Sequence, residues 1–63
     1  MTDAEFRQAR KQLGFRSAEE IHNLFGVSLR TWRVWESKGP TALAARYMQA
    51  LLAGWRPQDW PLK

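Results

Sequence analysis

Two arginines, Arg30 and Arg33, are the side chains whose spacing best suits them to bind a partner. They lie in a predicted helix over residues 29–37, which Ser28 can cap and which must end before Pro40. Steps of 100° per residue divide this helix into two sides. The side predicted to enter the core carries Thr31, Trp32 and Trp35. The opposite side carries Leu29, Arg30, Arg33, Val34 and Ser37. That side is a candidate binding surface, although an ordinary solvated helix face has a similar composition.

The distribution of charge points to a negatively charged partner. The 63 residues carry a formal net charge of +4. Residues 1–20 contain four basic and four acidic side chains, so they contribute none of this excess. It lies in residues 21–63, where six basic side chains accompany only two acidic ones. Such a surface favours a nucleic acid, although many small proteins carry a similar charge without that partner.

The residues that most catalytic or metal sites require are missing or isolated. The sequence has no Cys and a single His, His22, which lies among residues predicted to pack between helices. Glu19 and Glu20 are adjacent acids, but adjacent helical residues point about 100° apart. Both suit the positive end of a helix dipole. We therefore expect no enzyme activity, no metal site and no cofactor.

A first helix is predicted from Thr2, because Thr2 and Glu5 have the spacing of a capping box. One side of this helix is apolar except for a single charge, because the spacing places Arg10 on the same side as Phe6 and Leu13. A charge buried without a partner is expensive. We therefore predict an ion pair between Arg10 and Glu36, which follows the tryptophan side of the helix over residues 29–37.

A second capping box is predicted at Ser17 and Glu20, starting a short helix that runs to Phe25. Gly26 ends it, and Ser28 starts the next helix two residues later. Two helices joined by about three residues that include Gly form a helix-turn-helix arrangement. The motif spans about residues 17–37.

A fourth helix is predicted after Thr41, which can cap it, and Gly54 ends it. Candidates for its buried or partner-facing side are Leu43, Tyr47, Met48, Leu51 and Leu52. Residues 55–63 contain two Trp and two Pro and are predicted to be non-helical. Residues 41–63 thus carry more apolar side chains than one short helix needs for its own core. This excess, called the apolar surplus, predicts a homodimer surface. The alternative is that the C-terminal residues only cover the core of the monomer.

The chain length allows one domain, residues 1–63, which we predict to be an all-α domain of four to five helices. Without Cys its support must come from apolar side chains or self-association. No apolar run approaches the ~20 residues that cross a bilayer, and residues 1–10 are polar, unlike a secretory signal. We expect a cytoplasmic protein with no membrane partner.

The segment SAEEIHNLFGVSLRTWRVWE, residues 17–36, resembles the helix-turn-helix of the Cro and phage-repressor (XRE-like) class. A capped helix, a Gly-Val-Ser turn and a third helix ending in Trp-Glu carry the resemblance. The segment FRQARKQLGF, residues 6–15, resembles the first helix of that class. Among small prophage-encoded regulators of this shape, the chain is similar to anti-CRISPR-associated autorepressors and antitoxin-like autorepressors.

The resemblance implies residue roles on double-stranded DNA. It assigns base contacts to Arg30 and Arg33, which can each donate two hydrogen bonds to guanine. It also assigns apolar base contacts to Leu29 and Val34. The residues assigned to phosphate contacts are Ser17, Ser28, Ser37, Lys38 and Arg46. The sequence departs from the class in three places: His22 replaces a small residue, Arg16 lengthens a connection, and Ala18 replaces a polar residue.

These expectations describe a sequence-specific transcriptional regulator, most simply a dimeric repressor on a palindromic operator. Two other functions remain open. A protein-interaction module is predicted to carry aromatic or Leu anchors where Arg30 and Arg33 stand. A non-specific nucleic-acid binder is predicted to bind scrambled duplexes equally, with an affinity governed by salt.

Overall fold

Three helices of the protein begin at a hydroxyl side chain that accepts a hydrogen bond from the backbone of the first turn. In the computed structural model, which describes residues 1–60, these caps are Thr2, Ser28 and Thr41. At Thr2 the capping box is complete, because Glu5 Oε1 also accepts from the Thr2 N–H at 2.8 Å. These hydrogen bonds from Thr2 lower the pKa of Glu5, first through the Thr2 backbone. The three predicted caps are therefore confirmed.

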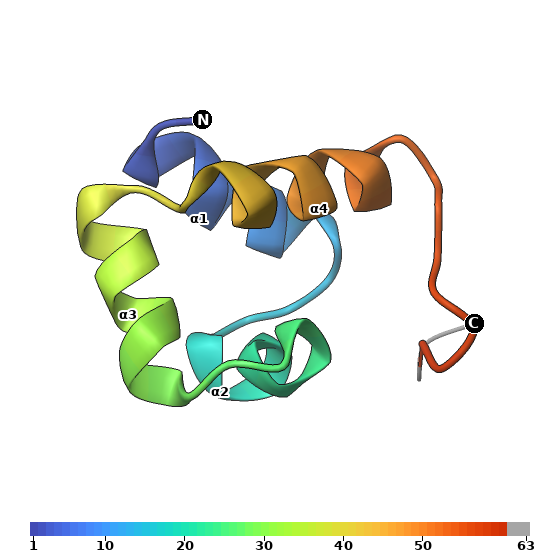
Figure 1. Cartoon of the computed structure of the whole chain (residues 1–63), viewed down its shortest axis with the longest axis horizontal. Helices are drawn as coiled ribbons and strands as arrows, with labels where there is room; N and C mark the ends of the chain where they lie inside the picture. The colour runs from blue at the N-terminus through green and yellow to red at the C-terminus, as the bar shows by residue number, and fades with distance from the viewer. Residues whose placement is uncertain (61–63) are drawn as a thin grey trace.

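The described residues form four α-helices and contain no strand. The elements are α1 (Asp3–Gln12), α2 (Ala18–Ile21), the 3-10 helix η1 (His22–Phe25), α3 (Leu29–Lys38) and α4 (Ala42–Leu52). The all-α prediction is confirmed for residues 1–60, and the last three residues of the expected 1–63 domain lie outside the described part. Figure 1 shows α1 and α4 side by side across one end, α3 descending at one edge, and α2 at the opposite end from α4.

The capping box predicted at Ser17 is wrong. The Ser17 side chain makes no cap hydrogen bond. Glu20, its expected partner, instead accepts at 2.7 Å from the backbone N–H of Arg16, which lies just outside the helix. The segment up to Phe25 was predicted to be one α-helix. It is α-helical only to Ile21 and continues to Phe25 as a 3-10 helix.

Two glycines shape the turns on either side of α3. Gly26 ends η1 with a φ of +70°, a left-handed conformation that side chains with a Cβ rarely adopt. The His22 ring spans this turn, since its Nδ1 lies 2.8 Å from the carbonyl oxygen of Val27. At the other end, Gly39 has a φ of +101° and directs the chain into Pro40. The third helix thus ends one residue later than predicted.

The core gathers large side chains from all four helices. Trp32, Phe6, Ile21, Met48 and Leu51 are the largest fully buried side chains. The Trp32 ring packs against two phenylalanines, with centroid distances of 4.7 Å to Phe6 and 4.7 Å to Phe25. Aromatic pairs in such tilted and edge-to-face arrangements add to the stabilisation from burial. The prediction that α3 turns a tryptophan side into the core is confirmed.

The segment after α4 carries no helix in its described part, residues 55–60. It descends on the side of the molecule opposite α3 (Figure 1). Trp60 packs edge-on against Phe15, with ring centroids 5.8 Å apart, and the Arg56 guanidinium lies 5.4 Å from the Trp60 ring centroid. This part of the segment therefore closes over the protein's own core. None of the helices in residues 1–60 has the length and apolar character needed to cross a bilayer.

Candidate nucleic-acid interface

The inner side of α3 packs that helix onto the core. Trp32 is fully buried and Trp35 is half-buried, with its ring centroid 6.0 Å from that of Phe6. Because both tryptophans leave from one side of a ten-residue helix, the opposite side must face away from the core. The rotation of α3 about its axis is therefore set by aromatic packing.

A buried ion pair adds a second anchor. Arg10 Nε donates to Glu36 Oε2 at 2.8 Å, so the structure contains the pair that the sequence predicts. Trp32 Nε1 donates to the same carboxylate oxygen at 2.6 Å, and Arg10 Nη1 donates to the Phe15 carbonyl oxygen at 3.0 Å. Within the described residues, no buried side-chain nitrogen or oxygen lacks a partner. The acid carried by α3 is thus neutralised on the inside and adds no free negative charge to the outer side.

The outer side of α3 is a shallow, open depression of about 430 Å³. It is lined by Leu29, Arg30, Arg33, Val34 and Ser37. These are the five residues that helical periodicity assigned to one side, and the structure brings them together. Arg30, Arg33 and Ser37 are exposed, Val34 is 46% exposed, and Leu29 is half-buried against the core. This side will be called the α3 outer face.

Two of the three serines expected on phosphates already form hydrogen bonds within the protein. Ser28 Oγ accepts from the Thr31 N–H at 3.2 Å and donates to Thr31 Oγ1 at 3.1 Å. Ser37 Oγ donates to the Val34 carbonyl oxygen at 3.2 Å. Ser17 is half-buried beside the start of α2 and makes no cap bond. Of the three, only Ser17 has a hydroxyl that no hydrogen bond among the described residues engages.

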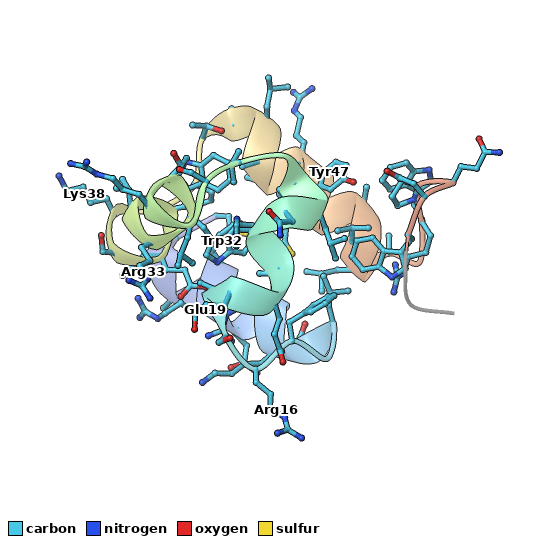
Figure 2. The ribbon with its side chains drawn as sticks, turned by 90° about the horizontal axis from the view of Figure 1, so that it is seen from below. Arg16, Glu19, Trp32, Arg33, Lys38 and Tyr47 are labelled. Carbon is cyan, nitrogen blue, oxygen red and sulfur yellow. The ribbon has the colours of Figure 1, made fainter. Side chains whose placement is uncertain are left out.

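The exposed cations are distributed unevenly around α3. Lys38 lies at the C-terminal end of the helix, on the same side of the molecule as Arg33 (Figure 2). In the described part of the chain, Arg30, Lys38 and Arg46 form no ion pair. Arg46 belongs to α4 and does not line the depression. The structure thus brings five of the six contacts predicted on α3 onto the α3 outer face and places the sixth, Lys38, at the end of the helix, whereas Arg46 lies on α4.

One contact on this surface was missed by sequence reasoning. Arg33 Nη2 donates to Glu19 Oε1 at 3.1 Å, which joins the α3 outer face to the first turn of α2. The two residues are fourteen positions apart, and the sequence analysis assigned Glu19 only a role in the helix dipole. Exposed Arg16, at the entry to α2, was treated only as an extra residue in a connection. Its position directly before Ser17, the N-cap residue of α2, is the signal that could have marked it as an exposed cation beside the start of that helix.

A second hollow, of about 650 Å³, lies between η1 and α4. Its lining includes Phe25, Trp35, Leu43 and Tyr47, with Asp59 at its edge. Burial raises the pKa of the Tyr47 phenol, and the charge of Asp59 raises it further, so this hydroxyl stays protonated at neutral pH. Among residues 1–60, no three acidic, His or Cys side chains gather as metal ligands.

Comparisons with models of known protein families, with curated protein sequences and with solved structures found no match to this chain.

Proposed function

We propose that this protein binds double-stranded DNA in a sequence-specific manner and regulates transcription. In this proposal α2, η1 and α3 form a helix-turn-helix, and α3 is the helix that enters the major groove. The observation that carries the proposal is the α3 outer face, an exposed helix side with two arginines whose opposite side is anchored by Trp32 and Glu36. A major groove about 12 Å wide accepts one α-helix.

The chemistry of the α3 outer face suits base edges. Each guanidinium of Arg30 and Arg33 can donate two hydrogen bonds to O6 and N7 of guanine, and Val34 and Leu29 can contact a thymine methyl group. Lys38, Arg46 and the start of α2 at Ser17 are assigned to phosphates, which fix the register of the helix on the duplex. The serines Ser28 and Ser37 can reach phosphate only by giving up or sharing their bonds within α3.

The same face argues against a protein-binding module. Protein interfaces depend on a few large anchors that fill pockets of the partner, and aromatic side chains are prominent among them. The α3 outer face carries no aromatic side chain, because both tryptophans of the helix point inward. Its arginines are flanked by small or apolar groups, which is the combination that base readout uses.

We also propose that the protein acts as a homodimer on a palindromic site, because one short helix reads only a few base pairs. Part of the apolar surplus behind this expectation is used within the monomer, since Met48 and Leu51 are buried and Trp60 packs on Phe15. Within residues 41–60, the large apolar side chains that remain exposed are Leu43 (81%), Leu52 (40%) and Trp55 (48%). Leu43 lies at the N-terminal end of α4 and Leu52 at its C-terminal end.

The dimer is tested by sedimentation equilibrium at micromolar concentration. The expected mass is twice 7.4 kDa. Leu43→Glu and Leu52→Glu, made separately, locate the contact, because only the variant at the interface should return to a single chain. A 7.4 kDa species that binds DNA as one copy per site contradicts the dimer and leaves the DNA-binding proposal standing.

The DNA-binding proposal is tested by selection from a randomised duplex library, followed by footprinting on the DNA upstream of the protein's own gene. The expected results are an enriched inverted repeat and its protection upstream of the gene, as for an autorepressor. The double variant R30A/R33A should keep its fold and enrich no sequence. Equal binding of all duplexes by the unaltered protein would instead identify a non-specific binder.

A further inference from the structure

The ion pair between Glu19 and Arg33 contributes little to the fold. The carboxylate and the guanidinium are 59% and 65% exposed, and a single nitrogen–oxygen contact of 3.1 Å joins them. Exposed pairs of this kind are strongly screened by water and add little to stability. The helices α2 and α3 are already joined through buried Ile21 and Trp32. Any effect of this pair is therefore expected on the binding properties of the surface where it lies.

On that surface the pair distinguishes Arg33 from Arg30. Both arginines line the α3 outer face, yet Glu19 contacts only Arg33. Figure 2 shows Glu19 on α2 directly beside the Arg33 side chain. The contact uses Nη2, and the other guanidinium N–H groups of Arg33 bond to no other group in the described residues. Arg33 is therefore held at one nitrogen and keeps donors available for a ligand.

A carboxylate at this place affects the two kinds of DNA acceptor differently. A phosphate is negatively charged, so Glu19 repels it and weakens its attraction to Arg33. The O6 and N7 atoms of guanine are neutral acceptors that bind through hydrogen-bond geometry, which a guanidinium fixed at one end supplies in advance. A neutralised arginine should thus contribute to base readout while adding little to non-specific attraction.

We propose that Glu19 is a positioning residue that reserves Arg33 for base edges and lowers affinity for DNA without the target sequence. This inference rests on the proposed DNA-binding function and assigns the control of specificity to a residue outside the third helix. Arg30, which has no such partner in the described residues, is then the arginine that responds to both bases and phosphates.

The test compares Glu19→Gln with Glu20→Gln. The two substitutions remove one negative charge from neighbouring exposed positions of α2, but Glu20 bonds to the Arg16 backbone and not to α3. Each variant is titrated against the duplex selected by the unaltered protein and against a scrambled duplex. We expect E19Q to raise affinity for the scrambled duplex about fivefold and to lower the selected-to-scrambled ratio by a similar factor. E20Q should leave that ratio unchanged.

A second pair of variants separates positioning from a general charge effect. If Glu19 acts through Arg33, the selected-to-scrambled ratio should be the same in R33A and in E19Q/R33A. An unchanged ratio in E19Q, an equal loss in E20Q, or a further loss in E19Q/R33A would each overturn the inference. These outcomes leave the proposed function intact, because the unaltered protein still prefers its selected duplex. Absence of any preferred duplex for the unaltered protein would overturn both.

Discussion

Two Arg–Glu pairs involve α3, one on its inner side and one on its outer side, and they differ chiefly in burial. Inside, the Arg10 and Glu36 side chains are 8% and 16% exposed and share their bonds with Trp32 and a backbone carbonyl. Outside, Arg33 and Glu19 are more than half exposed and share one contact. Removing one partner strands a desolvated charge only on the inside. The same chemistry is therefore expected to stabilise the fold on one side of the helix and to adjust ligand binding on the other.

The largest expected effect comes from the inner pair. Glu36→Ala leaves the Arg10 guanidinium buried without its carboxylate, so the free energy of unfolding should fall by about 3–5 kcal/mol. For a chain of this size that approaches the whole stability. Urea denaturation followed by tryptophan fluorescence measures the loss, with Glu19→Ala as the matched outer variant at under about 1 kcal/mol. Equal losses in the two variants would contradict the comparison.

The outer face is expected to affect binding rather than stability. Arg30→Ala and Arg33→Ala should each weaken binding to the selected duplex by about 1–3 kcal/mol and relax preference at one base pair per half-site. Their denaturation midpoints should match that of the unaltered protein, because both side chains are exposed. Lys11→Ala on α1 is the control for loss of one exposed positive charge. If both arginine variants keep full affinity, α3 is not the reading helix.

Cations at the margin should act alike on every sequence. Lys38→Ala and Arg46→Ala are each expected to reduce the slope of log affinity against log salt by about one, for selected and scrambled duplexes equally. Titrations at two salt concentrations measure both slopes. A sequence-dependent loss in Lys38→Ala would move this residue into the base-reading group. An unchanged slope in Arg46→Ala would place α4 outside the DNA interface.

The smallest expected effect concerns the start of the helices. Ser28→Ala removes the hydroxyl that caps α3, so stability should fall by about 1 kcal/mol. Ser17→Ala should leave stability nearly unchanged, because that hydroxyl makes no cap bond. Thermal denaturation of the two variants measures the difference. A loss in Ser17→Ala as large as that in Ser28→Ala would show that the predicted capping box at α2 exists after all.

The sequence by itself determined the features that depend on residues a few positions apart. Caps at Thr2, Ser28 and Thr41 need only a hydroxyl and the next helical turn, and the two sides of α3 follow from 3.6 residues per turn. Even the long-range pair of Arg10 could be predicted, because a charge on an apolar stripe requires an acid and few acids are present in the second half of the chain.

Tertiary structure alone decided the contacts that depend on how separate elements meet. Glu19 reaches Arg33, fourteen positions along the chain, because α2 lies beside α3. Trp60 lies against Phe15 because the chain after α4 descends on the side of the molecule opposite α3 and returns to the core (Figure 1). Local periodicity carries no information on these distances, since they are set by the packing of the helices around the buried Trp32.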